Sequence, residues 1–275
     1  MAIGINTPYG ALNALRVASA DATRASERIS SGLRVNRASD DPAGLAVATS
    51  LTTEIGGYTQ VKSSLTSAIS KVEQVGDSLT SISTILSSMK TLALSSISAS
   101  SDTQRATYQT AFASYMADIN NIASATTFTD TSVLDGTTSS VTIQVGIDTT
   151  DTKTLTFFNS TTSSSGLSIS SLSISTAATA TAAYAALETP IDTTTARIAT
   201  VGAYESSLGY LSDFADTMVL NLTAGYDSIM SADLAAEATN LAAAEIRESS
   251  ATAIVAQSNS LSKELVDFLL QSVVD

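Results

Sequence analysis

The sequence predicts a mainly α fold: long coiled-coil-like helical rods formed by the N- and C-terminal segments, with a small β-hairpin region in the middle. Apolar residues recur at heptad spacing along two long segments on either side of the middle. Between these segments, apolar and polar residues alternate as in a half-buried strand. Each of the three prolines follows Thr or Asp, which indicates capped helix starts at Thr7, Asp41 and Thr189.

The first helix is expected between Pro8 and Ser31. Gly32 follows it and suits the left-handed conformation in which many helices end. Residues 33–41 then form a short irregular link. Asp41 is expected to cap the helix that follows, and this position before proline explains it better than a role in acid–base chemistry or metal binding.

Two long segments carry apolar heptads. The first repeats every seven residues from Leu51 to Ala93, and the second follows Pro190 and continues to about Ile229. A helix between them is expected to be capped by Asp102. Because three such helices can cover one another, we favour an intramolecular bundle over packing between chains for these rods. The predicted rod seam consists of Leu51, Tyr58, Leu65, Val72, Leu79, Leu86, Leu208, Leu211, Met218 and Leu222.

A β-hairpin is predicted in the middle of the chain. Apolar residues alternate with polar ones from Val141 to Ile147 and again at Leu155 and Phe157. The two runs are therefore expected to pair across a turn. The Ser- and Thr-rich stretch 160–175 fits either a short strand or an exposed loop, and its composition does not separate the two.

The C-terminal stretch 233–270 predicts one helix with a narrow apolar stripe among many alanines. An alanine-rich helix buries little apolar surface per residue, so other chains are expected to cover it. We therefore predict that both terminal helices pack between subunits. The predicted interface residues are Leu12, Leu15, Arg24, Arg28, Ile29, Leu33, Leu241, Ile254, Leu261, Leu265, Phe268 and Leu269.

Arg24 and Arg28 belong to the one locally basic stretch, in which five arginines fall within the first 40 residues. They are four residues apart, on one face of the predicted helix, where carboxylates of a neighbouring subunit could meet them. A solvated face explains the same pattern equally well, because exposed ion pairs contribute only about 0–1 kcal/mol. Both interpretations stay open at this point.

The composition excludes most familiar catalytic mechanisms. The chain of 275 residues has no histidine and no cysteine, which removes His-based triads, thiolate nucleophiles and the usual zinc ligands. Neighbours such as Ser70 and Lys71 do not face each other on a helix, so a Ser-Lys dyad is not expected. We predict no catalytic residue, no metal site and no cofactor.

Charge and hydropathy limit the partners. The formal net charge of −13 disfavours binding to nucleic acid or to an anionic membrane, and no apolar run is long enough to span a membrane. The first ten residues lack the basic and apolar regions of a Sec-type signal. The chain is therefore expected to be either cytosolic or exported by a route that leaves its N-terminus uncut.

Both ends of the chain resemble bacterial flagellins. The stretch 30–51, SSGLRVNRASDDPAGLAVATSL, is similar to their N-terminal signature. The stretch 251–270, ATAIVAQSNSLSKELVDFLL, resembles their C-terminal block, and 142–146, TIQVG, is similar to the first strand of the family's β-hairpin. Matching blocks at both ends, in the right order, carry the resemblance.

The resemblance implies a structural subunit that polymerises into the extracellular filament of the bacterial flagellum through its terminal helices. It implies inner helical parts at 1–44 and 235–275 and an outer rod domain at 45–234, with the hairpin region at about 127–188. Only about 30 residues separate the hairpin from Thr189. The extra outer domains of larger flagellins are therefore expected to be missing.

The resemblance also implies partners, namely a flagellar export chaperone and the cap and hook-junction proteins. The family's patch for an innate immune receptor corresponds to residues 88–93. Ser88 and Thr91 stand where that patch has Arg and Glu, which argues against recognition by the receptor. The candidate region for O-linked glycans, which some flagellins carry, is Ser163, Ser164 and Ser165.

Two other functions were weighed against a filament subunit. A hook-filament junction protein would share the terminal helices, but the strong N-terminal signature argues against it. A secreted helical adhesin would need an exposed apolar or aromatic patch, and the middle of the chain offers mainly Phe157 and Phe158 for one.

Overall fold

The computed structural model describes residues 9–274, and within the last helix the side chains at 265, 268–270 and 272–274 lie outside the described part. Thr7, the predicted first cap, also lies outside it. The predicted mainly helical fold with a small β-hairpin region in the middle is confirmed. The described elements are α1 (Tyr9–Ser31), α2 (Pro42–Ile97), α3 (Asp102–Ala125), β1 (Thr127–Phe128), β2 (Thr131–Ser132), β3 (Ser140–Gln144), β4 (Thr152–Thr156), α4 (Ala177–Ala186), α5 (Glu188–Met230) and α6 (Leu234–Val274).

The chain divides into two compact units. The terminal unit consists of Met1–Thr53 and Asn221–Asp275, and the central unit of Glu54–Leu220. Helices α2 and α5 contribute residues to both units. The division expected from the sequence instead placed 45–53 and 221–234 with the rods.

Those residues group with the terminal helices because the link that follows α1 packs on them. Val35 is buried in a small cluster with Ala48 of α2 and Met230 of α5. The backbone N–H of Arg34 donates to the carbonyl oxygen of Met230 at 2.6 Å, and the guanidinium of Arg34 donates to that of Ile229 at 2.7 Å. The link is therefore fastened to the end of α5 by both backbone and side-chain hydrogen bonds.

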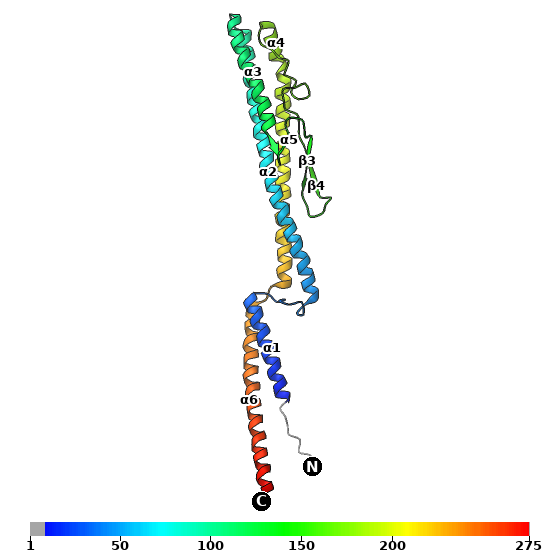
Figure 1. The fold of residues 1–275 in the computed structure, drawn as a ribbon, viewed down its shortest axis with the longest axis vertical. Helices are drawn as coiled ribbons and strands as arrows, with labels where there is room; N and C mark the ends of the chain where they lie inside the picture. The colour runs from blue at the N-terminus through cyan, green and yellow to red at the C-terminus, as the bar shows by residue number, and fades with distance from the viewer. Residues whose placement is uncertain (1–8, 275) are drawn as a thin grey trace. The chain divides into compact units, whose positions relative to one another are not determined.

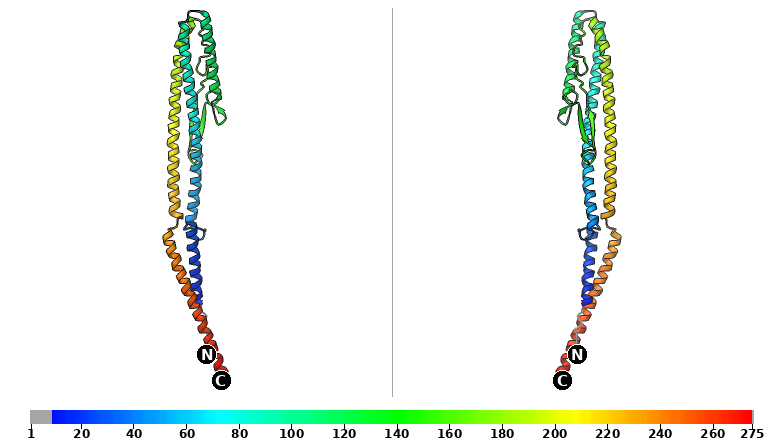
Figure 2. Two further views of the ribbon diagram at one scale, coloured as in Figure 1. Left: turned by 90° about the vertical axis from the view of Figure 1, so that its left-hand side faces the viewer. Right: turned by 90° about the vertical axis from the view of Figure 1, so that its right-hand side faces the viewer.

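Helices α2, α3 and α5 run side by side through the central unit (Figures 1 and 2). Phe112 and Ile119 of α3 and Ala215 of α5 enter the same core as the heptad residues of α2. The rods thus cover one another within a single chain. Of the predicted seam residues, Tyr58, Leu211, Met218, Leu51 and Leu222 are half-buried, and Leu65, Val72, Leu79, Leu86 and Leu208 are fully buried.

The predicted hairpin is present, with shorter strands than the alternation suggested. Strand β3 pairs antiparallel with β4, and Val141 lies opposite Leu155. Val145 and Ile147 belong to the turn instead of the strand. The chain leaves the ladder there because the Gln144 side-chain amide donates to the carbonyl oxygen of Gly146 at 2.9 Å and folds the turn back. A second, two-residue hairpin, β1–β2, was not predicted.

The stretch 160–175 is neither a strand nor an exposed loop. It has no regular secondary structure, yet Leu167, Ile169 and Ile174 are buried in the core of the central unit. Its backbone bonds to itself, because the N–H groups of Leu167 and Ile169 donate to the carbonyl oxygens of Thr161 and Thr162. These local hydrogen bonds satisfy backbone groups that would bond to a neighbouring strand if the stretch were itself a strand.

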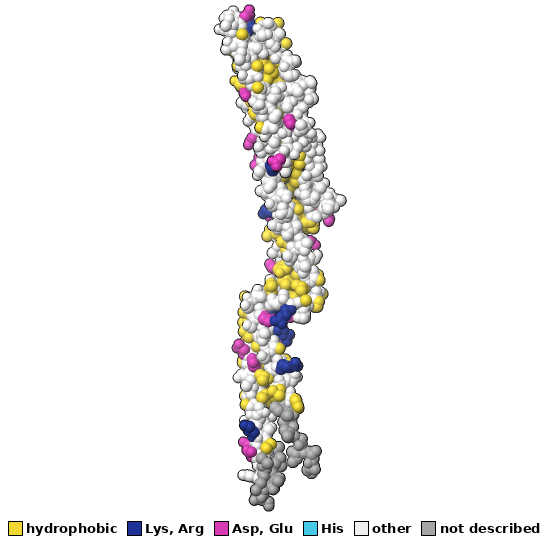
Figure 3. Space-filling model, in the orientation of Figure 1, with side chains coloured by type: hydrophobic (Ala, Val, Ile, Leu, Met, Phe, Trp, Pro, Cys, Tyr) yellow, Lys and Arg dark blue, Asp and Glu magenta, His cyan; other side chains and the backbone are white. Residues whose placement is uncertain are grey.

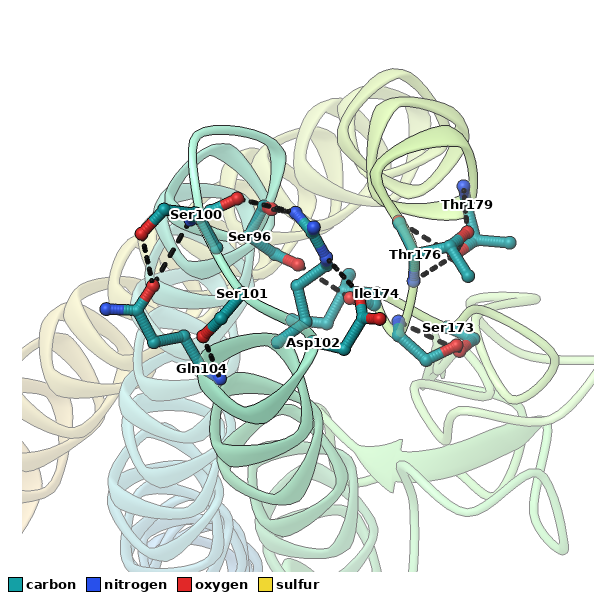
Figure 4. Close-up of polar contacts among 12 residues, drawn as sticks. Ser96, Ser100, Ser101, Asp102, Gln104, Ser173, Ile174, Thr176 and Thr179 are labelled. Atoms are coloured by element: carbon teal, nitrogen blue, oxygen red, sulfur yellow. Dashed lines mark hydrogen bonds and ion pairs between the residues drawn. The ribbon is translucent and has the colours of Figure 1, made fainter.

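A group of hydrogen bonds closes the turn between α2 and α3 (Figure 4). Ser101, rather than the predicted Asp102, is the N-cap of α3, and its hydroxyl accepts the N–H of Gln104 at 3.3 Å. Asp102 is the first helical residue and pairs with Arg105 at 3.3 Å. Arg105 also donates to the carbonyl oxygen of Ala99 at 2.7 Å, where α2 has ended. Side chains at this turn therefore bind the free backbone groups both after the end of α2 and at the start of α3.

The chain enters α4 beside that turn (Figure 4). Ser96 of α2 donates to the carbonyl oxygen of Ile174 at 2.6 Å, and Thr176 forms a capping box with Thr179. Helix α4 was not predicted, because its Ala- and Thr-rich sequence has no apolar periodicity. This helix also corrects the predicted cap at Thr189, which lies inside the first turn of α5 because α4 and α5 are separated by Leu187 alone.

Candidate functional site

Helices α1 and α6 of the terminal unit pack through alanines. Ala18 and Ala25 of α1 and Ala244 and Ala251 of α6 are buried. The Cα atoms of the two helices repeatedly approach within 8 Å, which small side chains permit. Such a seam buries little apolar area, so it holds the two helices together less firmly than the Leu- and Ile-rich core holds the central unit.

Several of the larger apolar side chains of these two helices are exposed. Val17, Ile246 and Ile254 border a hollow of about 420 Å³ between α1 and α6. Figure 3 shows apolar side chains on this part of the surface, next to basic ones. Contiguous exposed apolar surface on a protein usually marks an interaction site. The exposed large apolar residues of α1 and α6 are Tyr9, Leu12, Val17, Leu234, Ile246, Ile254, Leu261 and Val266.

The apolar members of the predicted interface fall into three groups. Leu12, Ile254 and Leu261 are exposed, with 45%, 59% and 56% of their surface accessible. The side chains of Leu265, Phe268 and Leu269 lie outside the described residues. The half-buried members are Leu15, Ile29, Leu33 and Leu241. The seam alanines are not among the predicted interface residues, although each helix spaces its two alanines by seven residues.

Charged side chains connect α1 and α6 beside the alanine seam. Arg28 pairs with Glu237 at 3.0 Å, and Asp21 receives both Arg247 at 3.3 Å and Arg24 at 2.6 Å. Together they line a cleft of about 190 Å³. Arg28 is thus engaged within its own chain, whereas the Arg24 side chain is 58% exposed. The partner of Arg28 is thus a carboxylate of the same chain, which differs both from a solvated face and from the neighbouring-subunit carboxylate considered from the sequence.

Two aromatic residues of α5 form an exposed patch in the central unit. Tyr210 and Phe214 are four residues apart and 74% and 52% accessible. These two residues were not predicted, because the heptad runs through Leu211 on another face of the helix. An i, i+4 pair of aromatic residues outside an apolar seam was the available signal.

The candidate glycan region lies in a loop rich in hydroxyl groups. Ser163 is half-buried and shares hydrogen bonds with Thr161 and Ser165, while Ser164 and Ser165 are exposed. The loop is held to α5 by Arg197, which donates to the carbonyl oxygen of Asn159 at 2.8 Å. Burial lowers the pKa of the Arg197 guanidinium.

The described residues contain no group of three or more His, Cys, Asp or Glu side chains arranged to hold a metal ion. None of the described helices is both long enough and apolar enough to cross a membrane. Asp41, the predicted cap of α2, accepts the N–H of Gly44 at 2.8 Å, so this carboxylate is occupied by the backbone.

These features define a mainly helical structural protein whose two terminal segments pair and leave apolar side chains uncovered. The family model described as the bacterial flagellin N-terminal helical region matches residues 5–139. The model described as the bacterial flagellin C-terminal helical region matches residues 184–269. Both matches fall on the helical segments from which the terminal unit and the rods are built.

Curated relatives match along most of the chain. Flagellin of Listeria innocua serovar 6a is 27% identical over 262 residues, which cover 90% of this chain and 91% of that protein. Flagellin of Halalkalibacterium halodurans is 27% identical over 247 residues, with the same coverage. The crystal structure of Bacillus cereus flagellin matches with a TM-score of 0.50 and 25% identity, covering 55% of this chain and 88% of that one.

The chain belongs to the bacterial flagellin family, and it is a short-form member of it. Its function is that of a structural subunit of the flagellar filament. The relatives favour neither a hook-filament junction protein nor an adhesin.

Proposed function

We propose that the outer faces of α1 and α6 are the surfaces through which subunits pack into the filament. One observation carries this proposal: the residues buried between the two helices are alanines, whereas Leu12, Ile246, Ile254 and Leu261 are exposed. A stable pair meant to stand alone would do the reverse, because larger side chains bury more apolar area. Subunits packed side by side would cover these residues.

We further propose that the terminal helices become fully ordered only on incorporation. The alanine seam offsets little of the conformational entropy that ordering α1 and α6 costs. The central unit has its own continuous core and is expected to fold first. A chain whose ends order late is also suited to export in an unfolded form.

The same proposal extends to the export, the partners and the chemistry of the chain. The chain is expected to be exported with its N-terminus uncut, with an export chaperone and the cap and hook-junction proteins as its partners. It is expected to catalyse no reaction and to need no cofactor. Tyr210 and Phe214 are proposed as a contact between central units, and the exposed Ser164 and Ser165 as the accessible hydroxyl groups of the glycan region.

Polar substitutions on the outer face of α6 test the proposal. Ile246→Ser and Ile254→Ser remove exposed apolar side chains, so the soluble chain should keep its stability. Burial of each isoleucine between subunits is worth roughly 1.5–3 kcal/mol, so the double variant should fail to elongate filament seeds in electron micrographs.

The matched control is Leu94→Ser, the same kind of change at a half-exposed position of the central unit. It should elongate seeds as the natural chain does. Normal elongation by the Ile246→Ser, Ile254→Ser variant would exclude the outer face of α6 as the packing surface.

A further inference from the structure

The two sides of the α1–α6 pair carry unlike charges. On a helix, the residue three positions after a seam alanine and the residue four positions after it lie on opposite sides of the seam. On α6, Arg247 follows Ala244 by three positions and Glu248 follows it by four. Arg247 lines the cleft of about 190 Å³, so Glu248 lies on the other side of the pair.

The side with the cleft is basic. The charged side chains that line the cleft are Asp21, Arg24, Arg28, Glu237 and Arg247, so three guanidinium groups share two carboxylates. Asp21 alone serves two of them, Arg24 at 2.6 Å and Arg247 at 3.3 Å. The side chains of these two arginines are 58% and 57% exposed. Because a guanidinium group has five N–H donors, both keep donors for a further carboxylate.

The opposite side is acidic. Glu245 and Glu248 are three residues apart on α6 and share a face. Neither forms an ion pair with any residue that the structure describes. Glu248 is half-buried, and the half-buried residues seven positions before and after it are the apolar Leu241 and Val255. Because water screens a half-buried charge less than an open one, a cation from a neighbouring chain would stabilise Glu248 more.

Apolar side chains accompany both charged sides. The hollow of about 420 Å³ shares Arg247 with the cleft, so the exposed Ile254 that borders it lies on the basic side. On α1, Leu15 precedes Ala18 by three positions and Leu12 precedes Leu15 by three, which places both leucines on the acidic side. A contact between the two sides would therefore bury apolar surface next to its ion pairs.

The two sides complement each other but not themselves. Basic side against basic side brings guanidinium groups of two chains together, and acidic side against acidic side brings their carboxylates together. Only the basic side of one chain against the acidic side of another pairs opposite charges. Such a heterologous contact leaves one unoccupied surface of each kind after every addition, so it can continue along a filament instead of ending at a dimer.

We propose that the basic side of one chain binds the acidic side of the next, with Glu245 and Glu248 of the neighbour as the carboxylates that Arg24 and Arg247 receive. The occupant of the cleft is then a second copy of this chain, which carries both the matching charge and an apolar surface beside it. The inference rests on the proposed packing of subunits through α1 and α6. It adds which two faces meet and that the contact has a direction.

Reversing the charge of one side at a time tests the contact. Arg24→Glu reverses the basic side, and Glu245→Arg with Glu248→Arg reverses the acidic side. In about 0.01 M salt, where charges act over roughly 30 Å, each variant alone should elongate natural filament seeds at least about tenfold more slowly than the natural chain, because like charges then meet. An equal mixture of the two variants should elongate seeds at close to the natural rate, because each supplies the charge that the other lacks.

Salt and a matched variant separate a local contact from a general effect of charge. In about 1 M salt, where the Debye length is about 3 Å, each variant alone should approach the natural rate. Lys153→Glu, in the central unit, changes the net charge by the same amount as Arg24→Glu. It should elongate seeds as the natural chain does in low salt.

Elongation at the natural rate by either charge-reversed variant alone in low salt would overturn the proposal. A mixture as slow as its components would also overturn it, as would an equal slowing by Lys153→Glu. Failure of the proposed packing surface shows separately, as normal elongation by the Ile246→Ser, Ile254→Ser variant, whose charges are natural. If that variant is blocked while the charge-reversed variants elongate normally, the packing surface stands and only the pairing of its basic and acidic sides is wrong.

Discussion

Thr129 and Asp130 adopt backbone conformations that residues with side chains rarely hold. They form the turn between β1 and β2, with φ angles of 51° and 62°. Two-residue hairpin turns with positive φ at both positions favour Asn-Gly, and the β-branched Thr129 is strained there. The absence of that turn signal explains why the β1–β2 hairpin was not predicted.

Replacing the two turn residues should relieve this backbone strain. Thr129→Asn with Asp130→Gly should raise the free energy of unfolding by about 1–2 kcal/mol, because the left-handed conformation no longer opposes a β-branched side chain. Urea unfolding measures the change. Thr149→Asn, in the turn of the other hairpin, should leave the stability nearly unchanged. Equal effects of both variants would contradict a strained β1–β2 turn.

Asp40 gives a prediction of pH dependence. Its carboxylate accepts the N–H of Arg37 at 3.0 Å, which is the main cause of its lowered pKa; the N–H of Asn36 and the charges of Arg28 and Arg37 act in the same direction. A carboxyl group with a lowered pKa in the folded state stabilises the fold above its unfolded-state pKa, and this stabilisation is lost as the pH falls through the folded-state value.

Asp40→Asn should therefore weaken thermal stability at neutral pH. The difference from the natural chain should shrink below about pH 3.9, the ordinary value for Asp, and vanish once the natural carboxyl group is protonated. Asp118→Asn, at an exposed position of α3, is the matched control. A stability difference that stays constant down to pH 2 would rule out a contribution from the Asp40 charge.

At the scale of elements, Ile147 in the turn of the hairpin β3–β4 packs against Gly57 of α2. A Cβ atom on Gly57 would lie 2.8 Å from Cγ2 of Ile147, whereas one on the neighbouring Gly56 would meet nothing within 4 Å. Both glycines lower the helix propensity of α2. At Gly57, the close approach of Ile147 explains why a residue without a side chain is present.

The two glycines should respond differently to alanine. Gly56→Ala should stabilise the chain by about 0.5–1 kcal/mol through helix propensity, and Gly57→Ala should gain less because Ile147 must move. In an Ile147→Ala background the two substitutions should give equal gains. Thermal unfolding of the set would disprove the contact if Gly57→Ala already matched Gly56→Ala in the natural chain.

The elements that the sequence predicted well are those with one dominant local signal. The heptads placed α2 and α5, and Gly32, with a φ of 71°, ends α1 as expected. The sequence failed where tertiary contacts replaced a local pattern. Helix α4 has a capping box but no apolar stripe. The composition of the stretch 160–175 left a strand and an exposed loop open, whereas the structure buries Leu167, Ile169 and Ile174 without a strand.

The packing of the terminal helices between subunits stays a prediction, and the structure adds the exposure and the contacts of the residues involved. Composition indicated that the terminal helices need cover from outside, and Leu12, Ile254 and Leu261 are exposed. The partner of Arg28 could not be read from the sequence, because Glu237 lies more than two hundred positions away. An antiparallel register depends on packing that one-dimensional spacing does not encode.

At the scale of the whole molecule, the two units differ in how they are stabilised. The central unit has a continuous core of large apolar side chains. The terminal unit relies on an alanine seam, ion pairs and the fastened link. The account predicts that the central unit is stable alone, whereas the terminal helices gain most of their stability from neighbouring subunits.

Amide hydrogen exchange of the natural chain, compared between soluble subunits and filaments, tests this claim most directly. The account predicts slow exchange for the core of α2 and α5 in both states, and a slowing of at least about tenfold for α1 and α6 in filaments, because neighbouring chains then cover them. Equally slow exchange of α1 and α6 in soluble subunits and filaments would contradict the account.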